Sequence, residues 1–280
     1  MMNKKLMAVA VAAILAIRST VQAQDDPALD KELKDFVTQV RQRAESDKRD
    51  AKNYADLFKK ADEMVAAHKS QKSDQVAQIL LLKAEINVEV TTNADRFDKA
   101  IAEIQELKKS FPETKQGMRA DAIIASFNEA RAADKIQASL VTGAPFPDFN
   151  ESDFAGKPVS LSGEKGKVVL VDFWATWCGP CRAEFPNVKQ TYESYHEKGF
   201  DIIGVSLDDD KSKLADYIKD KGVVWPQFFD GNGWSNKLAV KYGIRSIPAT
   251  FLVDAKGNLL GKDLRGPELQ AAVSNAVASK

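Results

Sequence analysis

The segment VVLVDFWATWCGPCRAEFP, residues 168–186, decides the fold, because it joins an apolar run to both cysteines of the chain. Its first seven residues are nearly all apolar, which is typical of a central strand covered on both faces. A helix is predicted to follow, from about residue 179 to residue 197. Cys178 and Cys181 therefore lie where a strand passes into a helix. They could form a redox pair, half of a metal site or a structural staple.

The position of Cys178 favours redox chemistry. At a helix N-terminus, unpaired amide groups and the helix dipole favour an anion, and the thiolate is the reactive form of cysteine. A free thiol has a pKa of about 8.5, which this position can lower by one or more units. Cys181 lies one helical turn further along, within disulfide reach. A bridge between them would close only a short loop and constrain little chain entropy, which disfavours the structural staple.

A metal site would need more ligands than this pair supplies. Zinc in proteins takes four tetrahedral ligands, and the pair provides two. The chain contains no other cysteine, and its two histidines, His68 and His196, lie in different predicted domains. We therefore expect a redox centre with no metal and no cofactor.

The residues around the cysteines resemble the active-site segment of the thioredoxin superfamily. The Trp-Cys-Gly-Pro-Cys core is far more specific than a bare Cys-x-x-Cys, and Pro186 matches the proline in that family's active-site helix. The stretch GIRSIPATFLVD, residues 243–254, is similar to the second family signature, whose Ile-Pro bond is cis. The resemblance implies that Pro248 lies beside the cysteines and that the backbone of Ile247 pairs with the substrate chain.

The flanking sequence narrows the resemblance. Residues 143–178, from GAPFPDF to WATWC, are similar to the extracytoplasmic TlpA/ResA-like branch. In that branch a hairpin precedes the core sheet, and an insertion separates the central strand from the cis-proline strand. The segment from Lys211 to Trp234 fits this insertion. The resemblance covers about residues 143–280 and implies an α/β thioredoxin fold, a central mixed sheet flanked by helices. The alternation of predicted strands and helices, ending in a hairpin and a helix, favours the same architecture.

Asp172 is the candidate acid–base residue. It lies in the apolar strand, where burial should raise its pKa and let it exchange protons near neutral pH. It aligns with the buried aspartate of thioredoxins, which assists deprotonation of the second cysteine, here Cys181. A carboxylate in a salt bridge at the strand end is the alternative. Glu184 is the second candidate acid, although we expect it on a solvated helix face.

The roles of the other site residues follow from disulfide exchange. Cys178 is predicted to attack a disulfide sulfur and form a mixed disulfide, which Cys181 then resolves. Trp177, Ile247 and Pro248 are the predicted substrate-binding residues.

Several conspicuous side chains have a less specific interpretation. We expect Trp225 and Trp234 to lie in the core, with a partner-facing position as the alternative. We expect His68 to be solvated among charged residues. The run Asp208-Asp209-Asp210 could suggest a cation site, but a strand-end turn that caps the next helix explains it better.

The N-terminal half is predicted to be a helical bundle over residues 25–140. Apolar residues recur at spacings of three and four in five segments, which begin near Leu29, Tyr54, Val76, Phe97 and Ile123. Ser73 and Asn93 could cap the helices that follow them. Residues 94–117 resemble a tetratricopeptide-type helix, but no second copy occurs at a fixed period. Prolines and a glycine at residues 142–147 mark a domain boundary before the thioredoxin-like domain, residues 143–280.

Residues 1–23 are predicted to be a secretory signal peptide. Lys4 and Lys5 precede an apolar run, residues 6–17, that is too short to span a bilayer, and small side chains favour cleavage after Ala23. An uncleaved interfacial anchor is the alternative. We therefore expect a periplasmic or otherwise extracytoplasmic protein, in a compartment where disulfides persist.

The function predicted by these features is that of an extracytoplasmic thiol-disulfide oxidoreductase. The Gly-Pro pair between the cysteines favours reduction of protein disulfides, with electrons supplied by a membrane-embedded donor. Forty basic residues balance forty acidic ones, so nothing in the charge indicates nucleic acid as a partner. The sequence leaves the oligomeric state open.

Two other functions compete with this prediction. A thiol peroxidase of the peroxiredoxin type shares the fold, but Ala175 stands where its motif requires threonine. The third possibility is a client-binding module, in which the helical half recognises the client and the redox centre is accessory.

Overall fold

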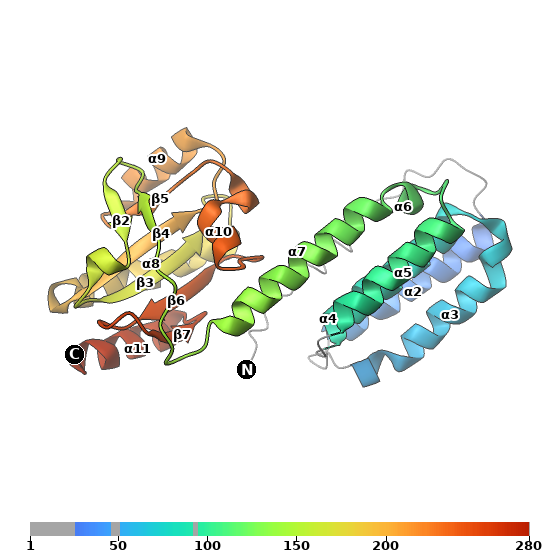
Figure 1. Ribbon diagram of the computed structural model, residues 1–280, viewed down its shortest axis with the longest axis horizontal. Coiled ribbons are helices and arrows are strands. Elements are labelled where there is room, and N and C mark those ends of the chain that lie inside the picture. The colour runs from blue at the N-terminus through green and yellow to red at the C-terminus, as the bar shows by residue number, and fades with distance from the viewer. Residues whose placement is uncertain (1–25, 46–50, 92–94, 280) are drawn as a thin grey trace. The chain divides into compact units, whose positions relative to one another are not determined.

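The computed structural model describes residues 26–45, 51–91 and 95–279 (Figure 1). The chain divides into two compact units, one ending at Arg131 and the other running from Ala132 to Lys280. The predicted signal peptide and the predicted cap Asn93 lie outside the described residues. Within the described ranges, no helix is both long enough and apolar enough to cross a bilayer.

The first unit is built from helices, as the apolar spacing predicts (Figure 1). They are α2 (Pro27–Glu45), α3 (Ala55–His68), α4 (Asp74–Val90), α5 (Arg96–Ser110), α6 (Lys115–Met118) and α7 (Ala120–Ser139), whose last residues belong to the second unit. Helix α4 packs against α2, α3, α5 and α6, so apolar side chains are buried around much of its circumference. The predicted cap at Ser73 is confirmed, because its hydroxyl accepts a hydrogen bond from the Val76 amide at 3.4 Å.

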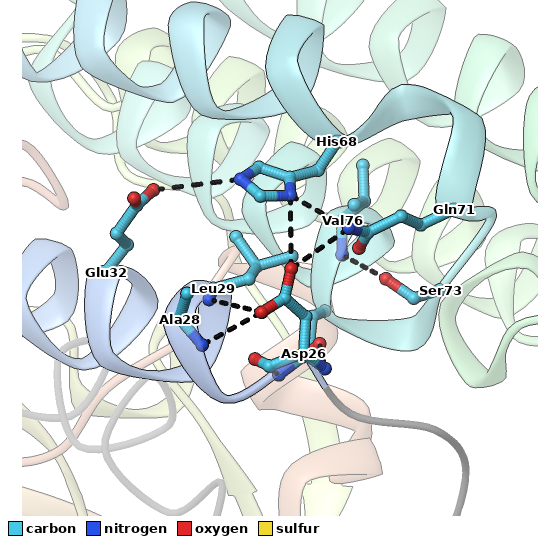
Figure 2. Close-up of polar contacts among 9 residues, drawn as sticks. Asp26, Ala28, Leu29, Glu32, His68, Gln71, Ser73 and Val76 are labelled. Atoms are coloured by element: carbon cyan, nitrogen blue, oxygen red, sulfur yellow. Dashed lines mark hydrogen bonds and ion pairs between the residues drawn. The ribbon is translucent and has the colours of Figure 1, made fainter.

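His68 is not solvated, and that expectation was wrong. Its side chain is 18% exposed and lies in a polar cluster at the end of α3 (Figure 2). Its Nδ1 atom is 3.0 Å from Gln71 Nε2 and 3.6 Å from Asp26 Oδ2, while its Nε2 atom is 4.0 Å from Glu32 Oε2. Asp26 also accepts a hydrogen bond from the Ala28 amide in the first turn of α2. The cluster thus joins the start of α2 to the end of α3, a contact that depends on tertiary packing.

The second unit contains a five-stranded mixed sheet and a separate hairpin (Figure 1). Its strands are β1 (Asn150–Ser152), β2 (Pro158–Ser160), β3 (Val168–Trp174), β4 (Phe200–Ser206), β5 (Gln227–Phe228), β6 (Ala249–Val253) and β7 (Leu259–Lys262). The order is β5-β4-β3-β6-β7, with β3 parallel to β4 and antiparallel to β6. Strands β1 and β2 form the hairpin that precedes the core sheet. The predicted α/β thioredoxin architecture is confirmed.

Helices cover both faces of this sheet, which explains the nearly continuous apolar run in β3. The helices are α8 (Gly179–Tyr195), α9 (Lys211–Lys221), α10 (Lys237–Lys241) and α11 (Gly266–Ala278). Val168 and Leu170 pack in one cluster with residues of α8 and α11. Val169, Val171 and Phe173 pack in the other, with residues of α9 and α10. Because side chains alternate along a strand, the side chain of Asp172 falls on the α8 and α11 face.

Replacing Leu170 tests the central position of β3. Leu170 is 0% exposed, so Leu170→Ala should lower the free energy of unfolding by about 2–5 kcal/mol through lost burial and the cavity left behind. Leu260→Ala is the matched control: this leucine on the edge strand β7 is 38% exposed, and its loss should cost about 0.5 kcal/mol or less. Urea denaturation of the oxidised proteins measures both values. Equal losses would contradict the assignment of β3 to the centre of the core.

Candidate active site

The two cysteines form a disulfide at the N-terminus of α8. The bond is 2.00 Å long and the Cα atoms are 5.3 Å apart. Cys178 is the N-cap of α8, and its sulfur accepts a hydrogen bond from the Cys181 amide at 3.2 Å. In the reduced protein, the same amide and the positive end of the helix would stabilise a thiolate on Cys178. The strand-to-helix junction expected from the sequence is therefore present, with a donor aimed at the first sulfur.

The loop that carries the disulfide is fixed to the end of β4 by a buried aspartate. Asp208 is 2% exposed and accepts hydrogen bonds from the amide and the hydroxyl of Thr176, the latter at 2.6 Å. The Ser206 hydroxyl donates to the same carboxylate at 2.8 Å. The aspartate run, residues 208–210, was predicted to form a turn that caps the next helix. This prediction is correct for Asp210, because its carboxylate accepts hydrogen bonds from two amides of α9. The role of Asp208 was not predicted, although its position just after β4, a strand parallel to β3, could have indicated it.

The cis-proline segment, residues 243–254, lies beside the disulfide because β6 pairs with β3. Phe173 is opposite Ala249 in an antiparallel register, so the residues after β3 lie next to the residues before β6. The Ile247–Pro248 peptide bond is cis, as the resemblance implies. The carbonyl oxygen of Ile247 lies 3.7 Å from the sulfur of Cys178.

The disulfide is largely covered, whereas the residue before it is not. Cys178 is 5% exposed and Cys181 is 6% exposed, while Trp177 is 51% exposed. Of the two tryptophans expected in the core, Trp225 is there, at 6% exposed. Trp234 is 45% exposed, so the core prediction was wrong for it. Trp234 lies in a short 3-10 turn, Gly233–Ser235, where no periodic pattern shows which way a side chain points.

Behind the disulfide, a small cavity joins the second cysteine to two carboxyl groups. Asp172, Cys181, Glu184 and Pro248 line it, together with an apolar wall of Trp174, Phe185, Val188, Val223 and Trp225. The volume open to the centre of a water-sized sphere is about 20 Å³, which is enough for one water molecule. The cavity therefore brings the side chains of Asp172, Glu184 and Cys181 to one small space.

Burial raises the pKa of Asp172 to about 7. The guanidinium of Arg265 acts in the opposite direction, and the nearby charge of Glu184 raises the pKa further. Arg265 is itself held by a hydrogen bond from its Nη2 atom to the carbonyl oxygen of Pro248. Asp172 can consequently give up or take a proton close to neutral pH, as the apolar strand around it suggests.

Glu184 does not lie on a solvated helix face, so that expectation was wrong. Its side chain is half-buried and accepts a hydrogen bond from the Gly266 amide at 2.6 Å. A second bond, at 3.2 Å, comes from Asn187 Nδ2. Gly266 is the first residue of α11, so Glu184 links α8 to the start of α11. The sequence could not show this because it depends on the packing of α11 against α8.

The histidine of this unit is not part of the site. His196 is stacked on Tyr192 with the ring centroids 4.5 Å apart, away from the cysteines. Among the described residues, no group of three or more histidine, cysteine, aspartate or glutamate side chains is placed to hold a metal ion. The chemistry that the arrangement supports directly is dithiol–disulfide exchange, with the half-buried carboxyl group of Asp172 in the cavity beside the second cysteine.

The fold and the site together define a class of protein. A Cys-x-x-Cys disulfide at the start of a helix, a cis-proline loop against it and a mixed sheet beneath them are the features of a thioredoxin-fold dithiol–disulfide protein.

Comparison with known proteins identifies the family. Residues 141–279 match the Redoxin family. The chain is 32% identical over 126 residues to the thiol-disulfide oxidoreductase ResA of Bacillus thuringiensis subsp. konkukian, covering 45% of this chain and 70% of that protein. It is 33% identical over 128 residues to ResA of Bacillus anthracis, covering 46% and 71%. The chain belongs to this family, the TlpA/ResA-like branch of the thioredoxin superfamily, and it is a thiol-disulfide oxidoreductase.

A solved structure gives a further similarity. The thioredoxin domain of a thiol-disulfide oxidoreductase from Bacteroides vulgatus is 36% identical, with a TM-score of 0.46, and the match covers 49% of this chain and 99% of that one.

The pKa of Asp172 predicts how stability changes with pH. The unfolded carboxyl ionises near its ordinary value of 3.8, and the folded one near 7. Between these values the folded protein keeps a proton that the unfolded chain has released, so stability is lost as the pH rises from about 4 to about 7. Asp172→Asn should therefore raise the free energy of unfolding at pH 8 by a few kcal/mol, at about 1.4 kcal/mol per pKa unit, and change it little at pH 4.

Urea denaturation of the oxidised protein at both pH values measures this effect. Asp209→Asn, at an exposed position in the turn between β4 and α9, is the control and should show no such dependence. A gain for Asp172→Asn that is the same at pH 4 and pH 8 would contradict the burial of an ionisable carboxyl group.

Proposed function

We propose that the protein reduces disulfides of protein substrates outside the cytoplasm, by exchange through its Trp-Cys-Gly-Pro-Cys motif. The observation that carries the proposal is the environment of Cys178. Its sulfur caps α8 and accepts a hydrogen bond from the Cys181 amide at 3.2 Å, and the Ile247 carbonyl oxygen lies 3.7 Å from the same sulfur. The first sulfur thus has a stabilised anionic form and lies beside a backbone segment that can bind a peptide.

The first step of the reaction is attack by Cys178. Its thiolate forms a bond to one sulfur of the client disulfide, the client S–S bond breaks, and the second client sulfur leaves as a thiolate that takes up a proton. The client is then held as a mixed disulfide. Trp177 and the backbone at Ile247 are the groups nearest to the client at this stage.

The second step is attack by Cys181, which must first lose its proton. Asp172 is the proposed acceptor, because it shares the cavity with Cys181 and its pKa of about 7 leaves it partly ionised at neutral pH. The Cys181 thiolate displaces the client sulfur from Cys178. Two electrons have then passed from the protein dithiol to the client, which leaves with two thiols, and the protein disulfide is the one in this structure.

The oxidised protein must be reduced before it can act again. We propose a membrane-embedded electron donor, because a reductase outside the cytoplasm has no direct access to cytoplasmic reductants. The extracytoplasmic location itself rests on the sequence of residues 1–23, and the Gly-Pro pair between the cysteines supports the reducing direction.

A trapping experiment tests the reaction. Cys181→Ser should accumulate mixed disulfides between Cys178 and client proteins, since the resolving thiol is absent. Cys178→Ser, which keeps the other cysteine, should trap none. Non-reducing electrophoresis and mass spectrometry of the native host detect the adducts.

An assay with purified protein separates this function from its competitors. The reduced wild-type protein should reduce insulin disulfides and consume hydrogen peroxide no faster than free dithiol does. Faster turnover of peroxide than of insulin would favour a thiol peroxidase. Activity on neither substrate, with no trapped client, would overturn the proposal in favour of a binding module.

Export makes a separate prediction. Expressed in a bacterial host with its own N-terminus, the protein should be recovered outside the cytoplasm and begin at Gln24, as intact mass would show. Leu15→Arg places a charge inside the apolar run and should leave the protein uncleaved in the cytoplasm. An exported protein that keeps its first residues would indicate an uncleaved anchor.

A further inference from the structure

We propose that Trp177 and Trp234 together form an aromatic clamp, which binds an apolar side chain next to the reactive cysteine of the client. The inference rests on the proposed function, because it concerns the polypeptide that is joined to Cys178 during the reaction. It assigns a role in substrate selection to Trp234, a residue of the inserted segment before the cis-proline strand.

The two indole rings lie together on the surface. Their centroids are 6.0 Å apart and their planes are inclined at 55°. Trp177 is 51% exposed and Trp234 is 45% exposed, whereas Trp174 and Trp225 are 7% and 6% exposed. Large aromatic side chains lose much favourable free energy when they stay in water, so an exposed pair beside a reactive group indicates a binding surface.

The loop that carries Trp177 is held rigidly. The neighbouring Thr176 donates two hydrogen bonds to the buried carboxylate of Asp208, one from its amide and one from its hydroxyl. Asp208 is in turn fixed by the Ser206 hydroxyl at the end of β4.

The turn that carries Trp234 is held to the same strand end. Asn236 is 0% exposed, and its Nδ2 atom donates to the carbonyl oxygen of Ser206 at 3.3 Å and to Asp230 Oδ1 at 3.1 Å. Its Oδ1 atom accepts from the amides of Leu238 and Ala239, both at 3.0 Å, at the start of α10.

Ser206 is thus the common anchor of both tryptophan-bearing segments. Its hydroxyl fixes the Asp208 network and its carbonyl oxygen fixes Asn236. Because the anchors are buried and hydrogen-bonded, the two rings keep their relative position before a client arrives. A preorganised aromatic pair loses little conformational entropy on binding, which is what an effective contact site requires.

The position of the clamp determines what it can bind. Trp177 directly precedes Cys178, so a mixed disulfide on Cys178 brings the residues that flank the client cysteine to these rings. Two indole faces offer mainly apolar area, and aliphatic or aromatic side chains gain most from it. The contact is independent of the backbone at Ile247, whose carbonyl lies against the sulfur itself.

Three disulfide peptides test the clamp. They are identical except for leucine, glycine or lysine beside the attacked cysteine, and they react with the fully reduced protein in single-turnover stopped-flow experiments. For the wild type, the rate constant should be about tenfold higher with leucine than with glycine. Trp234→Ala should reduce this ratio to about one or two, and Trp234→Phe should restore much of it.

Leu260→Ala is the control, since it removes a comparably exposed apolar side chain from the edge strand β7 and should keep the wild-type ratio. Equal rates for leucine and glycine in the wild type, or an unchanged ratio in Trp234→Ala, would overturn the clamp. A preference for lysine over leucine would also overturn it, because it would indicate a cation–π site instead. If the reduced wild-type protein reacted with none of the peptides, the proposed function itself would be overturned, and this outcome is distinct from a loss of the leucine preference alone.

Discussion

The hydrogen bond from the Cys181 amide to the sulfur of Cys178 is the interaction on which the rest of the catalytic unit depends. It exists because α8 begins directly after Cys178, so an otherwise unpaired amide of the first helical turn donates to the sulfur. The other parts of the unit hold this junction in place. Asp208 fixes the preceding loop to β4, and the pairing of β3 with β6 brings the cis-proline loop against the disulfide.

The two sides of the disulfide have different chemical environments, and the difference suits a two-step exchange. Cys178 directly follows the exposed Trp177, and its sulfur lies 3.7 Å from the carbonyl oxygen of Ile247. Cys181 lines a small cavity together with Asp172 and Glu184. In the proposed reaction, this difference lets Cys178 capture the substrate while Cys181 is activated beside the cavity.

Much of the fold and part of the site could be predicted from local patterns. The apolar run of β3, the helical periodicity of the first unit and the cap at Ser73 depend on neighbouring residues, and the structure confirms them. The placements of Glu184, His68 and Trp234 were predicted wrongly, and the role of Asp208 was missed. Glu184, His68 and Asp208 depend on contacts with elements far away in the sequence: Glu184 meets the start of α11, His68 meets Asp26, and Asp208 meets the loop after β3. Trp234 lies in a short 3-10 turn without a periodic pattern.

The sequence by itself determined the class of chemistry. Two cysteines spaced by one helical turn at the end of an apolar strand can form a reversible disulfide, and the sequence offers no further cysteine and only two histidines, in different predicted domains, to complete a zinc site with them. Only the tertiary structure decided which groups surround that disulfide. A carboxyl group acquires its pKa from burial, and an indole becomes available to a partner when its segment is anchored at the surface. Both conditions arise from packing between distant segments, which no local pattern records.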